Sequence, residues 1–258
     1  MQKTEVNLLY WKYKKASGNF GDELSVFIVE CLLNLEKYKL VLNHPQTDSP
    51  TQLNLAAIGS YIGGHLKQNT YIFGSGVRTL PVKKFKALNV CCVRGPLTQQ
   101  KLQEKNPHIN IPNIYGDPAL LLPLYYEPIL VNELCHKIGV VPHFSNYDAY
   151  KKMKLDEKFY LINPTNKWKT VINEICSCKS IISSSLHGLI CSDAYNKPNI
   201  WLDEFELDEG DFKFKDYFES QERTYKKITN LEEYNEMLLC TKGNTIDLNM
   251  LVEAFPFK

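Results

Sequence analysis

The sequence predicts an α/β protein built from two Rossmann-like halves with a central cleft. Apolar, strand-like runs alternate with helical segments, which is typical of parallel βαβ units. The alternation runs twice, on either side of a Pro- and Tyr-rich stretch at residues 122–128. Glycine loops follow the strands, at the end of the sheet where open α/β folds bind ligands. We expect an N-terminal half over 1–125 and a C-terminal half over 126–258, whose terminal helices can pack back on the first half.

The first half begins with an apolar strand, a glycine loop and a helix. Helical periodicity places Leu24, Phe27 and Ile28 on one face of that helix. Pro96 suits the first turn of a second helix, because its missing N–H would lack a partner there anyway. Expected strands lie at 6–11, 53–62, 70–73, 90–93 and within 114–122, and expected helices at 23–35 and 95–102.

The second half repeats the alternation. Val171, Ile172 and Ile175 form the inward face of its first helix. Expected strands lie at 137–141, 159–163, 180–183 and 199–202, expected helices at 168–178 and 189–195, and the tail over 230–255 is helical in pieces.

Composition narrows the class of protein. The chain has 258 residues, of which 44% are hydrophobic, and a formal net charge of +1. A balanced charge argues against nucleic-acid binding, which needs a basic excess. No apolar run approaches the ~20 residues that span a bilayer, and residues 1–6 lack the apolar core of a signal peptide. We therefore expect a cytoplasmic protein whose cysteines are reduced.

The stretch 181–189 holds the sharpest candidate for chemistry. Ser183, Ser184, Ser185 and His187 leave the end of a buried strand, and Gly188 opens the helix that follows. A histidine at the carboxyl end of a strand, surrounded by hydroxyl groups, is placed for acid–base work. The alternative is a structural histidine. Nucleophilic serine catalysis is less attractive, because no GxSxG elbow occurs and no acid is evidently placed to orient the ring.

Four further loops carry polar candidates. Asp22 follows two glycines near the N-cap of a helix, where it either caps the helix or accepts a proton from a substrate hydroxyl. Arg78 and Arg94 are two of only three arginines, and Arg94 precedes a Gly-Pro helix start, which favours a phosphate or carboxylate site. Two surface arginines are the alternative. His143 follows a strand of the second half and could face the cleft.

Other functions fit the sequence less well. The segment 74–79 lacks the third glycine of a GxGxxG motif, and an arginine stands where an NAD site expects an acid. No GxxxxGK[ST] motif occurs, which excludes a P-loop. Six carboxylates between Asp203 and Asp211 indicate a solvated loop, with a metal site as the alternative.

An ordered set of motifs resembles the polysaccharide pyruvyl transferase family. The resemblance covers about residues 8–202. The motifs that carry it are Gly18-Asn-Phe-Gly-Asp22, Phe73-Gly-Ser-Gly76, Val93-Arg-Gly-Pro96, Gly116-Asp-Pro118, Val141-Pro-His143 and Ser183-Ser-Ser-Leu-His-Gly188. The resemblance implies a GT-B-like fold and a transferase that moves the enolpyruvyl group of phosphoenolpyruvate onto two hydroxyls of a sugar, which gives a pyruvate ketal. Its implied acceptor is a capsular, exopolysaccharide or cell-wall glycan, often lipid-linked, with at most peripheral membrane association at the inner face.

The resemblance also implies a set of site residues. His187 matches the family's histidine. In a chemical scheme for that donor, His187 would supply a proton and Asp22 would take the proton of the attacking hydroxyl, with no metal or cofactor required. The family's Arg-Leu-His motif is Ser185-Leu186-His187 here, so Arg78, Arg94 or Lys167 would have to supply the missing anion contact. Further substrate-binding candidates in the same motifs are Asn19, Gly21, Gly76, Ser184, Ser185, Leu186 and His143. A sugar-nucleotide glycosyltransferase and a non-catalytic glycan-assembly protein remain as alternatives.

Overall fold

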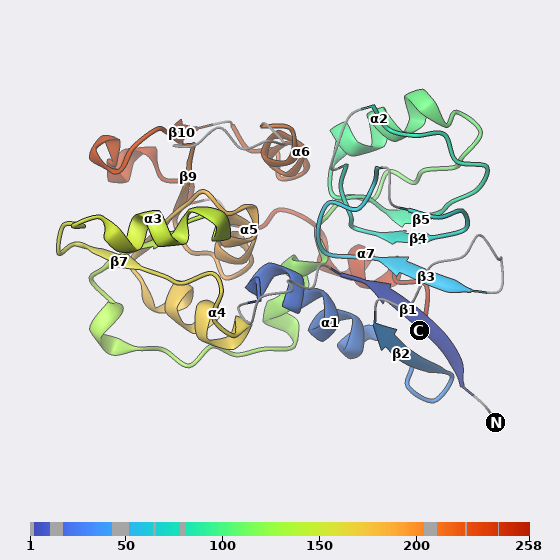
Figure 1. The fold of residues 1–258 in the computed structure, drawn as a ribbon, viewed down its shortest axis with the longest axis horizontal. Coiled ribbons are helices and arrows are strands. Elements are labelled where there is room, and N and C mark those ends of the chain that lie inside the picture. The colour runs from blue at the N-terminus through green and yellow to red at the C-terminus, as the bar shows by residue number, and fades with distance from the viewer. Residues whose placement is uncertain are drawn as a thin grey trace.

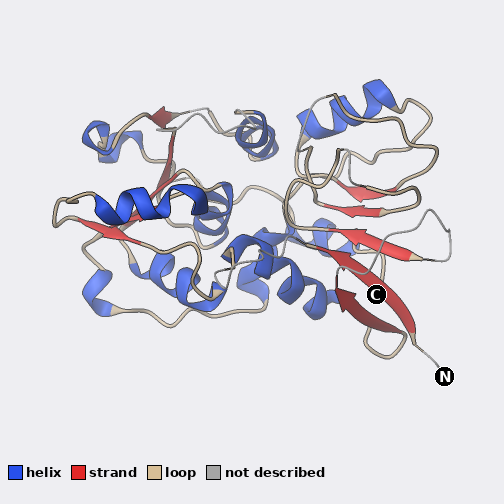
Figure 2. Cartoon of the chain, in the orientation of Figure 1, coloured by secondary structure: helices blue, strands red, loops and turns tan. Residues whose placement is uncertain are grey.

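The computed structural model consists of two parallel β-sheets flanked by helices (Figures 1 and 2). It describes residues 3–10, 18–42, 52–63, 66–77, 81–203, 211–224, 226–241 and 243–258. Each sheet has five strands, and every paired strand in both sheets is parallel. The predicted α/β class with two halves is therefore confirmed.

The first sheet has the order β2-β1-β3-β4-β5. Strand β1 lies between β2 and β3, and its last four residues, Val6 to Leu9, are buried. The elements of this half are β1 (Thr4–Leu9), α1 (Phe20–Leu32), β2 (Tyr38–Leu42), β3 (Leu53–Ala56), β4 (Tyr71–Phe73), β5 (Asn89–Cys92) and α2 (Pro96–Lys105).

The second sheet has the order β10-β9-β8-β6-β7. All four residues of β6, of β8 and of β9 are buried, as expected of strands that helices cover on both faces. The elements of this half are β6 (Ile138–Val141), α3 (Tyr147–Lys152), β7 (Phe159–Leu161), α4 (Trp168–Ser177), β8 (Ser180–Ser183), α5 (Leu186–Ala194), β9 (Asn199–Leu202), α6 (Phe212–Ser220) and β10 (Lys227–Ile228).

A short 3₁₀ helix, η1 (Pro118–Leu124), joins the two halves. Ala119 and the three leucines after it are fully buried, in a core cluster that contains side chains from both sheets. η1 packs against α1 of the first half and α5 of the second. Further single turns are η2 (Asn132–Leu134), η3 (Phe144–Asn146), η4 (Leu231–Glu233) and η5 (Glu236–Leu238).

The chain ends on the first half. The last helix is α7 (Leu248–Glu253). After it, the Phe255 ring packs edge-on against Phe73 of β4, with 5.2 Å between the ring centroids, and the Phe257 and Tyr71 ring centroids lie 4.8 Å apart. Figure 1 accordingly shows α7 beside the first sheet, next to β1 and β3.

Several local predictions need correction. The strand expected at 53–62 ends at Ala56, and the helix expected at 23–35 runs from Phe20 to Leu32. The helix after β8 begins at Leu186, not at 189, because Ser185 takes the extended N-cap conformation. The segment expected to hold a strand within 114–122 forms one isolated bridge, Val93 to Tyr115, and then turns into η1 at the proline. Helix α6 has no counterpart among the expected elements. Its Phe-Lys-Phe-Lys start alternates with period two and gives no helical pattern.

Candidate functional site

The loops at the carboxyl ends of both sheets meet at the junction of the two halves. His187, the sharpest sequence candidate, is the second residue of α5 and so lies in the first turn of a helix. The turn before it is built by Ser183, whose hydroxyl accepts a hydrogen bond from the Ser185 amide at 3.0 Å and donates to the Val141 carbonyl at 2.9 Å. This arrangement makes Ser183 structural and holds the start of α5 in place.

The helix α1 of the first half lies directly against His187. A Cβ atom built on Gly21 would lie 2.1 Å from Nδ1 of the His187 ring, so only glycine allows this approach. The start of α1 also contacts the second half, because the Phe20 amide donates to the Pro164 carbonyl at 3.0 Å. Asn19, not Asp22, caps the helix, with its side chain accepting from the Gly21 amide at 3.2 Å. Asp22 follows in the first turn and is buried.

A buried carboxylate faces the other side of the His187 ring. Asp117, the N-cap of η1, accepts the Ala119 amide on Oδ1 at 3.0 Å, and its Oδ2 lies 3.9 Å from Nε2 of His187. Both Oδ2 and Nε2 are buried, and neither has a hydrogen-bond partner among the residues that the structure describes. The sequence interpretation missed this acid. Its signal was the Gly116-Asp117-Pro118 turn after a predicted strand.

Arg94 is not a surface arginine. It is fully buried, and its Nε donates to Asp216 of α6 at 3.1 Å while Nη1 donates to Ser60 at 2.8 Å. The guanidinium packs on Gly76, where a Cβ would lie 2.2 Å from Cζ. Nη2 is buried and has no hydrogen-bond partner within the described part of the chain.

The anion position at the start of α2 is filled by the protein itself. The amide and the hydroxyl of Thr98 each donate to the Asp216 carboxylate at 2.7 Å. The helix start and guanidinium that the sequence favours for a donor anion therefore hold a carboxylate from the second half. Among its described contacts, Nη2 is the nitrogen of Arg94 that stays buried without an acceptor.

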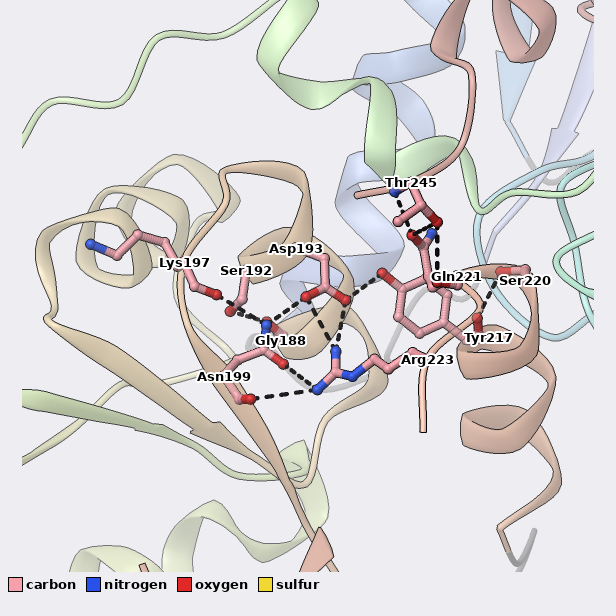
Figure 3. A network of polar contacts seen from close by, with 10 residues as sticks. All are labelled: Gly188, Ser192, Asp193, Lys197, Asn199, Tyr217, Ser220, Gln221, Arg223 and Thr245. Atoms are coloured by element: carbon pink, nitrogen blue, oxygen red, sulfur yellow. Dashed lines mark hydrogen bonds and ion pairs between the residues drawn. The ribbon is translucent and has the colours of Figure 1, made fainter. Parts of the chain in front are cut away.

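Arg223, the third arginine, is a structural residue of the second half (Figure 3). Its guanidinium donates to Asp193 of α5 at 2.9 Å and to the side chain of Asn199 at 2.8 Å. Tyr217 of α6 donates to the same Asp193 at 2.7 Å. This network fixes α6 to α5, so the helix that carries Asp216 belongs to the same body as His187.

Burial sets the charge states of the pair at the centre of the site. The pKa of His187 falls to about 3, because burial disfavours the charged ring and the cations Arg94 and Lys213 disfavour it further. Burial raises the pKa of Asp117 to about 6, although the Ala119 amide and Arg94 act in the opposite direction. Above pH 6 the protein without substrate thus pairs a neutral His187 with an ionised Asp117.

The lowered pKa of His187 predicts a loss of stability in acid. In the unfolded chain His187 has a pKa near 6.5. Between about pH 6.5 and pH 3 the ring is therefore protonated in the unfolded chain but neutral in the folded protein. The contribution of the neutral His187 ring to the free energy of unfolding is complete above pH 6.5 and is lost as the pH falls. The raised pKa of Asp117 has the opposite effect: its contribution to the free energy of unfolding increases as the pH falls from about 6 to about 4.

We expect His187→Gln to remove the histidine contribution. The difference in unfolding free energy between wild type and variant should then change by up to ~1.4 kcal/mol per pH unit below pH 6.5. Urea unfolding of both proteins at pH 7.0, 6.0 and 5.0 measures it. Parallel stability curves for the two proteins would contradict the lowered pKa.

The close approach of Gly21 gives a second prediction. In Gly21→Ala the new methyl group must push the His187 ring aside, since the built Cβ also lies 2.9 Å from Cβ of His187. A displacement near 1 Å costs about 10²-fold in turnover, while the helix itself tolerates alanine. Steady-state assays measure it. Glu30→Ala, an exposed site on the same helix, is the control and should stay fully active.

The remaining candidates spread around the junction. The Ser184 hydroxyl accepts from the His143 amide at 2.9 Å and so ties the loop after β6 to the loop after β8. Ser185 is the N-cap of α5 and Leu186 its buried first residue. Lys167 is exposed at the start of α4, where the next amide, Trp168, donates to Glu23 of α1 at 3.3 Å. Arg78 lies outside the described residues.

Among the residues that the structure describes, no three His, Cys, Asp or Glu side chains gather in a way that could hold a metal ion. Residues 204–210 of the acidic run lie outside the described residues. Within the same described ranges, no helix combines the length and apolar character that a membrane crossing requires.

Two parallel sheets with an acid–base pair at their junction define an α/β protein whose site draws on both halves. The profile of the polysaccharide pyruvyl transferase family matches residues 19–204 of this sequence, which include Gly21, Arg94, Asp117 and His187. The chain belongs to the polysaccharide pyruvyl transferase family.

Individual relatives are more distant. An uncharacterized protein of Acanthamoeba polyphaga mimivirus is 26% identical over 238 residues, which cover 88% of this chain and 80% of that protein. The succinoglycan biosynthesis protein ExoV of Rhizobium meliloti is 28% identical over 197 residues, which cover 73% of this chain but 57% of ExoV. A crystal structure of a functionally uncharacterized protein of Klebsiella pneumoniae matches with a TM-score of 0.48 at 13% identity, covering 88% of this chain and 94% of that one.

Proposed function

We propose that this protein transfers the enolpyruvyl group of phosphoenolpyruvate onto a sugar of a capsular, exopolysaccharide or cell-wall glycan and forms a pyruvate ketal there. The observation that carries the proposal is His187 in the first turn of α5, between the buried Asp117 and the start of α1. Membership of the family and the similarity to a succinoglycan biosynthesis protein support it.

The chemistry asks for one acid, one base and anion contacts. His187 protonates the methylene carbon of the donor, which creates an oxocarbenium-like centre. Asp22, in the first turn of α1 beside Gly21, takes the proton of the attacking hydroxyl. Inorganic phosphate leaves, and the neighbouring hydroxyl attacks the same carbon and gives its proton to the departing phosphate, which closes the ketal. Nη2 of Arg94, the exposed Lys167 and Arg78 are the cations proposed for the carboxylate and phosphate of the donor.

A general-acid role sets a condition on the order of events. The pKa of about 3 leaves His187 neutral in the protein without substrate. The negative charges of the donor favour the charged ring, so the donor binds first and His187 takes up its proton in that complex. The same coupling predicts that donor affinity rises as the pH falls.

Mass spectrometry of the products tests the proposed function. Candidate glycans are incubated with phosphoenolpyruvate and the full chain, and we expect the mass increment of a pyruvate ketal together with release of inorganic phosphate. His187→Gln serves as the inactive control and Glu30→Ala as the active one. Release of a nucleoside diphosphate from a sugar nucleotide would identify a glycosyltransferase instead, and glycan binding without turnover would identify a non-catalytic glycan-assembly protein.

A further inference from the structure

The two nitrogens of His187 have different surroundings. Nε2 is buried and points at Oδ2 of Asp117, 3.9 Å away, whereas Nδ1 lies on the side of Gly21 at the start of α1. The side chain keeps 13% of its surface exposed, and because Nε2 is buried the exposed part lies elsewhere on the ring. Nε2 is therefore closed to a substrate, because the part of the side chain that stays exposed includes none of its surface.

Asp117 is held so that Oδ2 cannot turn away without cost. Its other oxygen, Oδ1, caps η1 through the Ala119 amide, and the four residues after Pro118 are fully buried in the core shared by both halves. Rotation of the carboxyl group would break this cap. Burial of an ionised oxygen without a partner costs free energy, which a proton on Nε2 would offset.

The charged groups around the pair keep His187 neutral and act on the charge of Asp117 in both directions. Arg94 and Lys213 act on His187 as cations, and Arg94 also stabilises the charge of Asp117. Burial and the negative charge of Asp216 raise the pKa of Asp117. The thiols of Cys92 and Cys191 and the hydroxyl of Tyr217 stay protonated, because burial and the nearby charge of Asp117 raise their pKa values. Among these described neighbours, His187 is the one whose neutral form can place a ring N–H on Oδ2.

We propose that Asp117 is the positioning residue of His187: its Oδ2 accepts the Nε2 proton, so that Nδ1 is the nitrogen that exchanges a proton with the substrates. The assignment of that exchange to enolpyruvyl transfer rests on the proposed function, but the tautomer does not. We expect the 3.9 Å separation to shorten to a hydrogen bond in the complex with substrate, because catalytic hydrogen bonds commonly tighten there.

The proton balance of the step follows from this geometry. With the donor bound, a proton from solvent enters at Nδ1, and the imidazolium keeps its Nε2 proton on Asp117. His187 then gives the Nδ1 proton to the methylene carbon of phosphoenolpyruvate and returns to the neutral Nε2–H form. Asp117 stays ionised throughout and touches no substrate.

Nitrogen NMR of the folded protein reads the tautomer directly. The chain holds six histidines, so ¹⁵N-histidine labelling gives a spectrum in which the absent signal of His187→Gln assigns the ring. At pH 7.5 we expect wild-type His187 as the neutral Nε2–H tautomer. A neutral Nδ1–H tautomer would overturn the proposal, and this readout needs no substrate and no variant of Asp117.

Asp117→Asn supplies the second arm. The asparagine oxygen can keep the cap on Ala119, which places its NH₂ group where Oδ2 stood, facing Nε2. Because this group donates, we expect the ring to switch to the Nδ1–H tautomer and turnover to fall about 10²-fold. Donor KM should change less than kcat. Asp148→Asn, the same change at an exposed position of α3, should leave the tautomer and the rate as in wild type.

The two arms separate this inference from the proposed function. If wild type makes no pyruvate ketal but shows the Nε2–H tautomer, which Asp117→Asn reverses, the positioning role stands and the enolpyruvyl chemistry fails. If wild type is active and Asp117→Asn retains both tautomer and rate, Asp117 is only a cap of η1. If Asp117→Asn fails to fold, the wild-type tautomer alone decides.

Discussion

Replacement of His187 by alanine is expected to lower turnover by about 10²–10⁴-fold, the usual contribution of a positioned proton donor. Donor binding should suffer less, because the cations proposed for the donor, Nη2 of Arg94, Lys167 and Arg78, remain. The ring has a buried edge against Asp117 and a glycine on its other side, so alanine also leaves a cavity and stability should fall modestly. Steady-state kinetics and a urea titration of the same preparation measure both effects.

His187→Gln separates proton transfer from hydrogen bonding. Glutamine preserves much of the shape of histidine and can donate to Asp117, but it does not titrate near neutral pH. We expect it to be nearly as inactive as alanine. Near wild-type turnover would mean that His187 acts through a hydrogen bond, and unfolding of both variants would make it a structural histidine.

The largest expected effect on stability belongs to Asp216→Ala. The ion pair of Arg94 and Asp216 is almost completely buried, with 1% and 0% of the side-chain surfaces exposed. Loss of the carboxylate leaves the Nε of Arg94 and the Thr98 amide without their partner. Removing one member of such a pair costs about 3–5 kcal/mol, because an uncompensated charge stays buried. Chemical denaturation of wild type and variant measures the loss.

Two control variants test whether the loss in Asp216→Ala comes from the buried ion pair. Glu5→Ala breaks the exposed pair with Lys39 and should leave stability almost unchanged, because solvent screens that pair. The double variant Arg94→Met/Asp216→Leu removes both buried charges and should recover part of the lost stability. A loss below about 1 kcal/mol in Asp216→Ala would show that the pair does not hold the halves together.

Local patterns were enough for the architecture and for the position of His187. The alternation of buried apolar runs with amphipathic segments predicts parallel βαβ units, and β8 has the predicted bounds. The predicted ranges of β6 and α4 differ from the observed ones by a single residue. The glycine loops follow the strands, so placement of their residues at the carboxyl ends of the sheets could be expected before the structure. These features depend on neighbours in the sequence.

The partners of the site residues depended on the tertiary structure. Asp117 meets His187, and Asp216 meets Arg94, across separations in sequence of 70 and 122 residues, for which no local pattern exists. The sequence therefore pointed to Arg94 as a free anion clamp at a helix start, while the fold fills that position with a carboxylate of its own. By itself, the sequence determined which chemical groups lie at the ends of the strands. Only the packing of η1 and α6 between the halves decided which of these groups face one another. The physical reason is that a buried charge or polar atom is destabilising unless a partner of opposite charge or a hydrogen-bond partner lies next to it.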